Sequence, residues 1–473
     1  MKKLISILCA LMWTNVALAQ SFPKPPDVPD YVPVTVTYQP RPGTNQLGDG
    51  SNAKGGTPPA YASQPADIPA TTTTGWVVNT SISGNFCDLP PSGGTCAEAK
   101  ARFVAETSHI SADDPIRNYC QPGMSHLHQF FGNRTTNACS TFASLRNNAN
   151  AFKGASTFGG GIVNGTAYWF PCPIKTNPFS NGKNYCVKSD YQIIYYTENP
   201  YNGYVKLNRI PRSLRYVTGH RMDAPGSTGY VDFDAEIAAA NAQSGTGGRY
   251  YRVGRGTGWI GWGCESTGES GKRYLGKKDG SAGGFTTPCP SSSRIYAEII
   301  APQCWDGVNL WSPGGYKHFR HAIGDNDTGA QDICPNGWYR IPQLILKIFF
   351  THQGEADYKT WRLSSDDTAE VACGGCTIEN GESFHTDWFG AWDDAIFMAW
   401  QDNCLGVNAT PHECNYSVIS ATQRLITDSA APDGSRTPQQ VNLTNAYGTT
   451  LAANMWEIPS SYNGPKTLHS RGP

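Results

Sequence analysis

The chain has 473 residues, with 37 basic and 38 acidic side chains, so its formal net charge at neutral pH is −1. This balance argues against the basic surface expected of a protein that binds nucleic acid or an anionic membrane. Only 16% of the residues are charged, whereas 13 are tryptophan and 23 are tyrosine. Exported proteins of this composition often stack sugars on exposed aromatic rings, although most such rings fill a core.

The first nineteen residues are typical of a secretory signal peptide. Lys2 and Lys3 precede the apolar run "LISILCALMW", and the small residues "ALA" end just before Gln20. That run is too short to cross a bilayer comfortably, and no later run is long enough. We therefore expect a secreted protein, extracellular or periplasmic, without a membrane span.

The cysteines agree with export. Of the 15 cysteines, one lies in the signal peptide, which leaves an even number for up to seven disulfides in an oxidising compartment. Short closures fit the spacing at Cys87–Cys96, Cys172–Cys186 and Cys404–Cys414.

Composition divides the remaining chain into two parts. Residues 20–75 are rich in Pro, Ser and Thr and read as an extended, disordered linker. Residues 76–473 are globular in composition and contain no second linker, so we expect one domain.

Strand-like runs recur through this domain as β-branched or aromatic segments bounded by Pro, Gly or Asn. They are "TAYWFPCPI" (166–174), "YQIIYYTE" (191–198), "RIYAEIIAP" (294–302) and "PQLILKIFF" (342–350). Helical candidates are fewer, namely "CAEAKARFVAE" (96–106), "FDAEIAAANAQ" (233–243) and "TDWFGAWDDAIFMAWQ" (386–401). The balance predicts a mainly β fold, sandwich or jelly-roll-like, disulfide-rich, with long loops and a few packed helices.

The stretch "PGMSHLHQFFGN" (122–133) places two of the ten histidines one residue apart. In an extended segment, residues i and i+2 point to the same face, so His126 and His128 would stand side by side. They could then share a metal, a substrate oxygen or a proton, or they could simply be two polar rings on a solvent-facing strand. This spacing is a weaker chelation signature than HExxH.

Further polar clusters follow in aromatic or turn-rich context. "QCWDGVNLWSPGGYKHFRHAI" contains Asp306 beside a tryptophan, and also His321. "GESFHTDWFGAWDD" contains His385 and Asp387 one residue apart, just before or at an expected helix start. Asp306 could equally close a turn anchored by a buried indole, and Asp387 could equally be a favourable acid in the first turn of a helix.

These clusters resemble a known family. "SHLHQFFGN", "RYVTGHRM", "APQCWDGVNL", "HFRHAI", "CPNGWYRIPQLILKIFF" and "GESFHTDWFGAWDDA" fall in the order of the domain-of-unknown-function family numbered nineteen ninety-six, a secreted family of fungi and bacteria. The resemblance spans roughly Ile110 to Cys404, and it implies a fold class and an exported location but no settled activity. The turn "SSDD" departs from the family pattern. That pattern carries over to His126, His128, Trp305, Asp306, Gly307, His321, His385 and Asp387.

Histidines and carboxylates together suit acid–base chemistry, because imidazole exchanges protons near neutral pH. We therefore expect a carbohydrate-active enzyme that cleaves a polysaccharide or cell-wall glycan, with hydrolysis slightly favoured over β-elimination. The expected catalytic residues are His126, His128, Asp306, His321, His385 and Asp387. The expected substrate-binding residues are Trp305 and Trp388, as stacking platforms, and Arg221, as a counter-charge.

Two other classes of function remain open. One is a non-catalytic protein that binds glycan or cell wall. The other is a secreted metal-binding protein, in which His126, His128 and one more histidine hold zinc or copper. The expected enzyme needs no cofactor, although Asp325, Asp327 and Asp332 have a spacing that suits calcium.

Overall fold

The computed structural model describes most of the chain between residues 100 and 405 and several flanking segments. The described residues are 22–36, 77–79, 86–88, 100–105, 107–147, 157–158, 163–197, 207–221, 237–242, 250–252, 260–281, 283–326, 331–405, 412–415, 418–425, 451–452 and 455–458. The expected signal peptide and the Cys87–Cys96 closure lie outside them.

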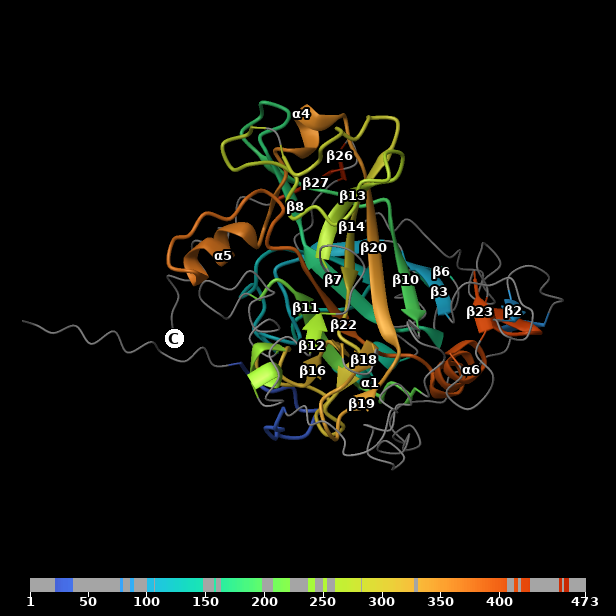
Figure 1. Ribbon diagram of the computed structural model, residues 1–473. Coiled ribbons are helices and arrows are strands. Elements are labelled where there is room, and N and C mark those ends of the chain that lie inside the picture. Colours follow the sequence, from blue (N-terminus) through green and yellow to red (C-terminus); the bar gives the residue numbers. More distant parts are fainter. Residues whose placement is uncertain are drawn as a thin grey trace, which may run out of the picture.

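A mainly β fold is confirmed, and its centre is a pair of sheets packed face to face (Figure 1). The larger is eight-stranded and contains, in order, β13 (Ile260–Cys264), β14 (Arg294–Ile300), β20 (Gln343–Thr351), β10 (Tyr191–Thr197), β3 (Lys100–Ala105), β23 (His412–Cys414) and β2 (Phe86–Asp88), with β6 (Thr157–Phe158) paired to β3. The smaller is five-stranded, in the order β11 (Arg215–Gly219), β22 (His385–Phe389), β7 (Ala167–Pro171), β5 (His128–Gly132) and β4 (Thr107–Ser111).

The two sheets share one aromatic core. Phe170 of β7 lies edge-on to Phe350 of β20, with ring centroids 5.8 Å apart. The indole Nε1 of Trp388, on β22, donates to the hydroxyl of Tyr196 on β10 at 3.3 Å. Buried side chains from both sheets form the same cluster, so burial of apolar area between the sheets is the main force that holds the sandwich together.

Smaller sheets and short helices surround this sandwich. A second five-stranded sheet contains β21 (Arg362–Leu363), β8 (Pro173–Thr176), β9 (Asn184–Val187), β27 (Met455–Glu457) and β26 (Leu451–Ala452). One three-stranded sheet contains β1 (Val77–Asn79), β25 (Gln423–Leu425) and β24 (Val418–Ser420). A second contains β12 (Tyr250–Arg252), β17 (Ile323–Asp325) and β18 (Gln331–Ile333). A third contains β16 (Phe319–Arg320), β15 (Cys304–Trp305) and β19 (Tyr339–Arg340). The helices are α1 (Phe142–Arg146), α4 (Glu355–Tyr358), α5 (Asp366–Ala372) and α6 (Asp394–Leu405), and α6 packs beside β3, β23 and β24 (Figure 1).

The four strand-like runs are confirmed as strands, but the helix predicted at residues 96–106 is wrong, and the helix predicted at residues 386–401 is confirmed only from Asp394 onward. Residues 100–105 form β3, with every second side chain buried, because the alternation of Ala101, Phe103 and Ala105 serves the sandwich core. Residues 385–389 form β22, and the helix begins only at Asp394. Gly390 separates the two, and both faces of β22 are buried, which hides the period of two that marks a half-exposed strand. The third candidate is helical at residues 237–242.

Disulfides crosslink several segments of the chain. Six pairs join described cysteines, namely Cys120–Cys139, Cys172–Cys186, Cys264–Cys289, Cys304–Cys334, Cys373–Cys376 and Cys404–Cys414. Two of the three expected short closures are therefore confirmed. None of the described helices is both long and apolar enough to cross a membrane.

Residues 22–36, in the range expected to be a linker, pack against the domain instead. Asp27 forms an ion pair with Arg215 at 2.6 Å, and the Arg215 side chain is fully buried. Val28 is 4% exposed and joins the apolar cluster on the outer face of the smaller sheet. The segment therefore covers the face that carries the histidines described next.

Candidate metal centre

The smaller sheet has one aromatic face and one face that carries titratable side chains. Antiparallel pairing places Val217, Asp387, Trp169 and Phe130 in one row across β11, β22, β7 and β5. His385 lies two residues before Asp387 on β22, and His128 lies two residues before Phe130 on β5. The strand period of two therefore directs His385, Asp387 and His128 to the same face.

Three imidazole rings meet on that face. His126, His128 and His385 each offer one ring nitrogen, and these three nitrogens all lie within 4.8 Å of one another. The ring centroids of His126 and His128 are 4.2 Å apart, and those of His126 and His385 are 5.0 Å apart. The exposed fractions are only 6%, 0% and 1%, respectively, so the rings meet inside the protein. This is the convergence that the i, i+2 spacing of His126 and His128 suggested, with His385 as the third member.

Backbone carbonyls fix the tautomers of two of these rings. His128 Nδ1 lies 2.9 Å from the carbonyl oxygen of Asp113, and His385 Nδ1 lies 2.9 Å from that of Ser383. A carbonyl oxygen only accepts, so each Nδ1 must carry the proton and donate it. Each Nε2 is then left with its lone pair, the arrangement in which a second partner orients a metal-binding histidine.

Two of the Nε2 atoms have no hydrogen-bond partner among the described residues. They belong to His126 and His128, and both atoms are buried. Buried polar atoms normally find a partner, so these two unpartnered ring nitrogens need an explanation.

Burial also keeps the rings neutral. Desolvation lowers the pKa of His128 to about 3. It lowers the pKa values of His126 and His385 well below their usual range, and the neighbouring His128 ring lowers both further. Neutral imidazole is the form that binds a metal, so no proton has to leave these three rings near neutral pH.

Asp387 is a fourth buried group on this face without a partner. Its side chain is 0% exposed, and neither carboxyl oxygen has a hydrogen-bond partner among the described residues. Burial raises the pKa of this carboxyl well above its usual range, and the nearby carboxyl of Asp114 raises it further. Trp169, directly opposite on β7, also has an unpartnered indole Nε1. Unpartnered atoms of Asp387 and Trp169 thus accompany those of the histidines.

The loop between β4 and β5 closes over the rings and contributes charge. Asp114 Oδ1 accepts from the backbone N–H groups of Ile116 and Arg117 at 2.8 and 3.0 Å, which shapes the turn. Arg117, 6% exposed, lowers the pKa values of the three histidines and of Asp387, so its positive charge lies close to all of them. The same guanidinium lies over the rings of Phe22 and Tyr316, with centroid distances of 5.5 and 5.8 Å.

Sequence reasoning did not identify the role of Asp366, which holds in place the Ser383 carbonyl that accepts from His385. Asp366 is fully buried, and its carboxylate accepts from the N–H groups of Leu363, Gly381 and Ser383 and from the Ser383 hydroxyl. It thereby pins the turn whose Ser383 carbonyl orients His385. Burial raises the pKa of Asp366 to about 6. The only feature of the sequence that pointed to Asp366 was the turn "SSDD".

The expected site residues near position 306 are part of the structural framework. Asp306 accepts from the N–H groups of Val308 and Asn309 and from the Asn309 side chain, so it closes a turn and makes no hydrogen bond to the three histidines. Trp305 donates to the Asn309 carbonyl at 2.6 Å and is 0% exposed. Trp388 is 1% exposed and faces the shared core. Neither indole presents a face on which a sugar could stack.

The remaining expected residues are not members of the group of three ring nitrogens. His321 follows β16 and is not among the three ring nitrogens that converge. Arg221 follows β11 and lies over the Tyr316 ring at 5.3 Å from its centroid. Of the expected calcium ligands, Asp327 lies outside the described residues, and so do the side chains of Asp325 and Asp332.

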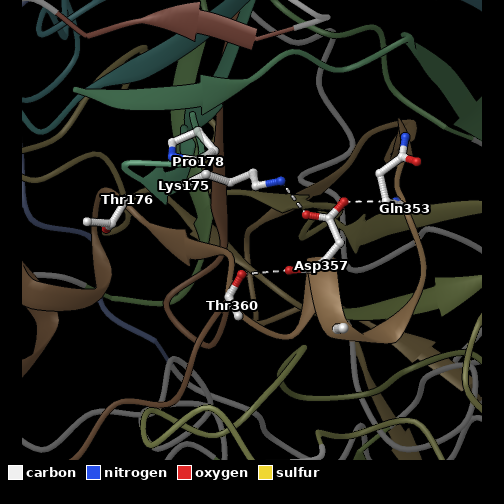
Figure 2. Close-up of a pocket in the computed structure, with 7 residues that line it drawn as sticks. Lys175, Thr176, Pro178, Gln353, Asp357 and Thr360 are labelled. Carbon is white, nitrogen blue, oxygen red and sulfur yellow. Dashed lines mark hydrogen bonds and ion pairs between the residues drawn. The ribbon is translucent and has the colours of Figure 1, made fainter. Parts of the chain in front are cut away.

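A surface pocket of about 520 Å³ opens elsewhere, between the β8–β9 hairpin and α4 (Figure 2). Its charged groups neutralise each other, since Lys175 Nζ lies 2.5 Å from Asp357 Oδ1 and the N–H of Gln353 donates to Asp357 Oδ2 at 2.8 Å. None of the expected site residues lines this pocket. Its lining is Lys175, Thr176, Pro178, Gln353, Ala356, Asp357 and Thr360.

Comparison with known proteins places the whole cluster within one family. No curated protein and no solved structure matches the chain. A family model described as a domain of unknown function, DUF1996, matches residues 114–392, which include all three histidines and Asp387. The match covers more than half of the chain, and the protein therefore belongs to this family.

Proposed function

We propose that this protein is exported and that His126, His128 and His385 bind one divalent zinc or copper ion. The observation that carries the proposal is the meeting of three neutral imidazoles within 4.8 Å, two of which are held by backbone carbonyls in the tautomer that presents Nε2. Imidazole nitrogen suits both ions, and three histidines form a common ligand set.

Burial favours an ion over a polymer as the occupant of this site. The three rings and the Asp387 carboxyl have exposed fractions of 6% or less. A metal ion can enter such a site during folding or through small fluctuations, whereas a polysaccharide chain needs an open cleft with aromatic walls.

The test uses the mature chain after removal of metal with a chelator and dialysis. Zinc titrated by calorimetry, with elemental analysis of the dialysed complex, should give one ion per chain. His128→Ala should lose this binding, whereas His318→Ala, at a buried histidine outside the cluster, should keep it. Zinc binding that is unchanged in His128→Ala would contradict the proposal.

A second candidate function is the cleavage of a polysaccharide by acid–base chemistry. The observation in its favour is Asp387, a buried carboxyl whose pKa is raised well above its usual range by burial, which is the direction of shift that suits a general acid. A glycan panel would test it: reducing ends without an unsaturated product indicate hydrolysis, and an unsaturated product indicates β-elimination. Retention on insoluble glycan without turnover would indicate a binding protein instead.

A further inference from the structure

The carboxyl of Asp387 has the nearby charge of Arg117, but no hydrogen bond from the described residues, to offset its burial. It is 0% exposed, and both its oxygens lack a hydrogen-bond partner among the described residues. Other buried carboxylates of this protein are well supported: Asp366 accepts four hydrogen bonds and Asp306 accepts three. A buried carboxyl without such support is costly, and the cost persists in functional sites where another partner arrives.

The position of Asp387 on its strand suggests what that partner is. His385 and Asp387 are residues i and i+2 of β22, so their side chains leave the same face of the sheet. His128 leaves the same face from β5, and the His126 ring lies beside His385, with ring centroids 5.0 Å apart. The Nε2 atoms of His126 and His128 have no hydrogen-bond partner among the described residues. We propose that Asp387 supplies the fourth ligand of the ion held by the three histidines, which gives a closed His₃Asp centre for zinc.

This inference rests on the proposed metal binding and specifies its coordination. The group of atoms within 4.8 Å contains the three ring nitrogens and not the carboxylate, so coordination draws Asp387 toward the rings. No hydrogen bond among the described residues holds the carboxyl back from this movement. Three neutral nitrogens and one carboxylate oxygen form a tetrahedral donor set that suits zinc better than the tetragonal preference of Cu²⁺.

A fourth protein ligand changes what the centre does. A catalytic zinc site keeps one position for water or substrate, whereas a structural site fills all four with protein atoms. With Asp387 bound, the ion would link the β4–β5 loop, β5 and β22 and would leave no position for an exogenous ligand. The ion then crosslinks segments of the smaller sheet, as the six disulfides between described cysteines crosslink other segments.

Cobalt substitution tests this coordination directly. The full mature chain, freed of metal and loaded with one Co²⁺, should show the intense visible absorption of a four-coordinate ion, and added azide should leave the spectrum unchanged. Asp387→Ala should still bind Co²⁺ through the three histidines, but its spectrum should shift when azide is added. The matched control Asp306→Asn, a buried carboxylate outside the cluster, should behave as the wild type.

The zinc affinity of Asp387→Asn, which keeps the size and shape of the side chain, gives a second measurement. Asp387→Asn should weaken zinc binding by more than about 100-fold, since the loss of a mere supporting partner already costs about 10–100-fold. An azide-sensitive wild-type spectrum, or an Asp387→Asn affinity equal to that of the wild type, would overturn the fourth-ligand role and leave the three-histidine site standing. A wild type that binds neither Zn²⁺ nor Co²⁺ would overturn both.

Discussion

Two regions of this protein bury histidines in opposite ways. At His109 and His318 both ring nitrogens are satisfied: each Nε2 donates to a backbone carbonyl at 2.9 and 3.0 Å, and each Nδ1 accepts from a serine hydroxyl at 2.9 and 2.8 Å. At the cluster, the buried Nε2 atoms of His126 and His128 have no hydrogen-bond partner among the described residues.

Histidine rings that are similarly buried thus differ in how many of their nitrogens are hydrogen-bonded. A ring with both nitrogens hydrogen-bonded stabilises the fold by itself, because its desolvation is offset by two bonds. A cluster of half-satisfied rings is a net cost until something binds there. The contrast separates histidines whose two ring nitrogens are both hydrogen-bonded from histidines whose Nε2 has no partner among the described residues. The following predictions test what this difference means for stability and for metal binding.

The largest expected effect is the stabilisation of the cluster by metal. A ligand present at about 1,000 times its Kd stabilises a folded protein by about 4 kcal/mol. Zinc should therefore raise the unfolding free energy of the wild type and of His318→Ala by about this amount, and that of His128→Ala by far less. Chemical denaturation with zinc or with chelator measures the difference, and an equal gain in all three proteins would break the comparison.

The next effect concerns the metal-free protein, in which His318→Ala should lose more unfolding free energy than His128→Ala. His318→Ala removes two hydrogen bonds and leaves a cavity, so it should cost about 3 kcal/mol of unfolding free energy. His128→Ala removes one hydrogen bond and relieves an unpartnered buried nitrogen, so it should cost about 1–2 kcal/mol. Denaturation in the presence of chelator compares the two variants. A larger loss in His128→Ala would mean that its ring already acts as a structural histidine.

The pH dependence of stability should reflect the satisfied histidines. Burial lowers the pKa of His109 to about 4 and that of His318 to about 3, from the usual value of 6.5. As the pH falls below 6.5, the unfolded chain takes up protons that the folded chain refuses, so stability is present above that pH and is lost toward about pH 4 and below. Each histidine contributes a slope of up to about 1.4 kcal/mol per pH unit.

A variant isolates this contribution from those of the other titrating groups. With chelator present, the unfolding free energy of His318→Gln should fall less steeply between pH 6.5 and 5 than that of the wild type, by up to about 1.4 kcal/mol per pH unit. Identical slopes would show that the His318 ring is protonated in the folded protein.

The smallest expected effect is a gain in stability. The raised pKa of Asp387 means that the unfolded chain ionises this carboxyl above its usual pKa while the folded chain keeps it protonated, so stability falls as the pH rises. Without metal, Asp387→Asn should therefore be more stable than the wild type near neutral pH, by about 1 kcal/mol. Thermal unfolding in chelator measures this. A less stable variant would indicate that the Asp387 carboxylate is already compensated.

Sequence alone predicted the fold class, and its expected site residues included the three histidines of the cluster and Asp387, with Asp306 and His321 expected beside them. The pairing of His126 with His128 follows from a local rule, because residues i and i+2 share a strand face wherever the strand lies. The third ring was harder to place, since the apolar spacing of Trp388, Trp392 and Ile396 imitates a helix. Only the pairing of β22 with β11 and β7 makes His385 and Asp387 neighbours on one face.

Other features depend on contacts that no local pattern encodes. Asp306 beside a tryptophan looks catalytic, yet its three hydrogen bonds stay within its own turn. Asp366 supports His385 through a turn seventeen residues along the chain. Residues 22–36 have a linker-like composition, and the buried partner Arg215 that attracts Asp27 lies 188 positions away.

The metal content of the mature protein tests the central claim most directly. After chelation, incubation with excess zinc and exhaustive dialysis, elemental analysis should find one zinc ion per wild-type chain and none per chain of a variant in which His126, His128 and His385 are all replaced by alanine. A folded wild type that retains no zinc or copper, or a triple variant that retains as much as the wild type, would contradict the account.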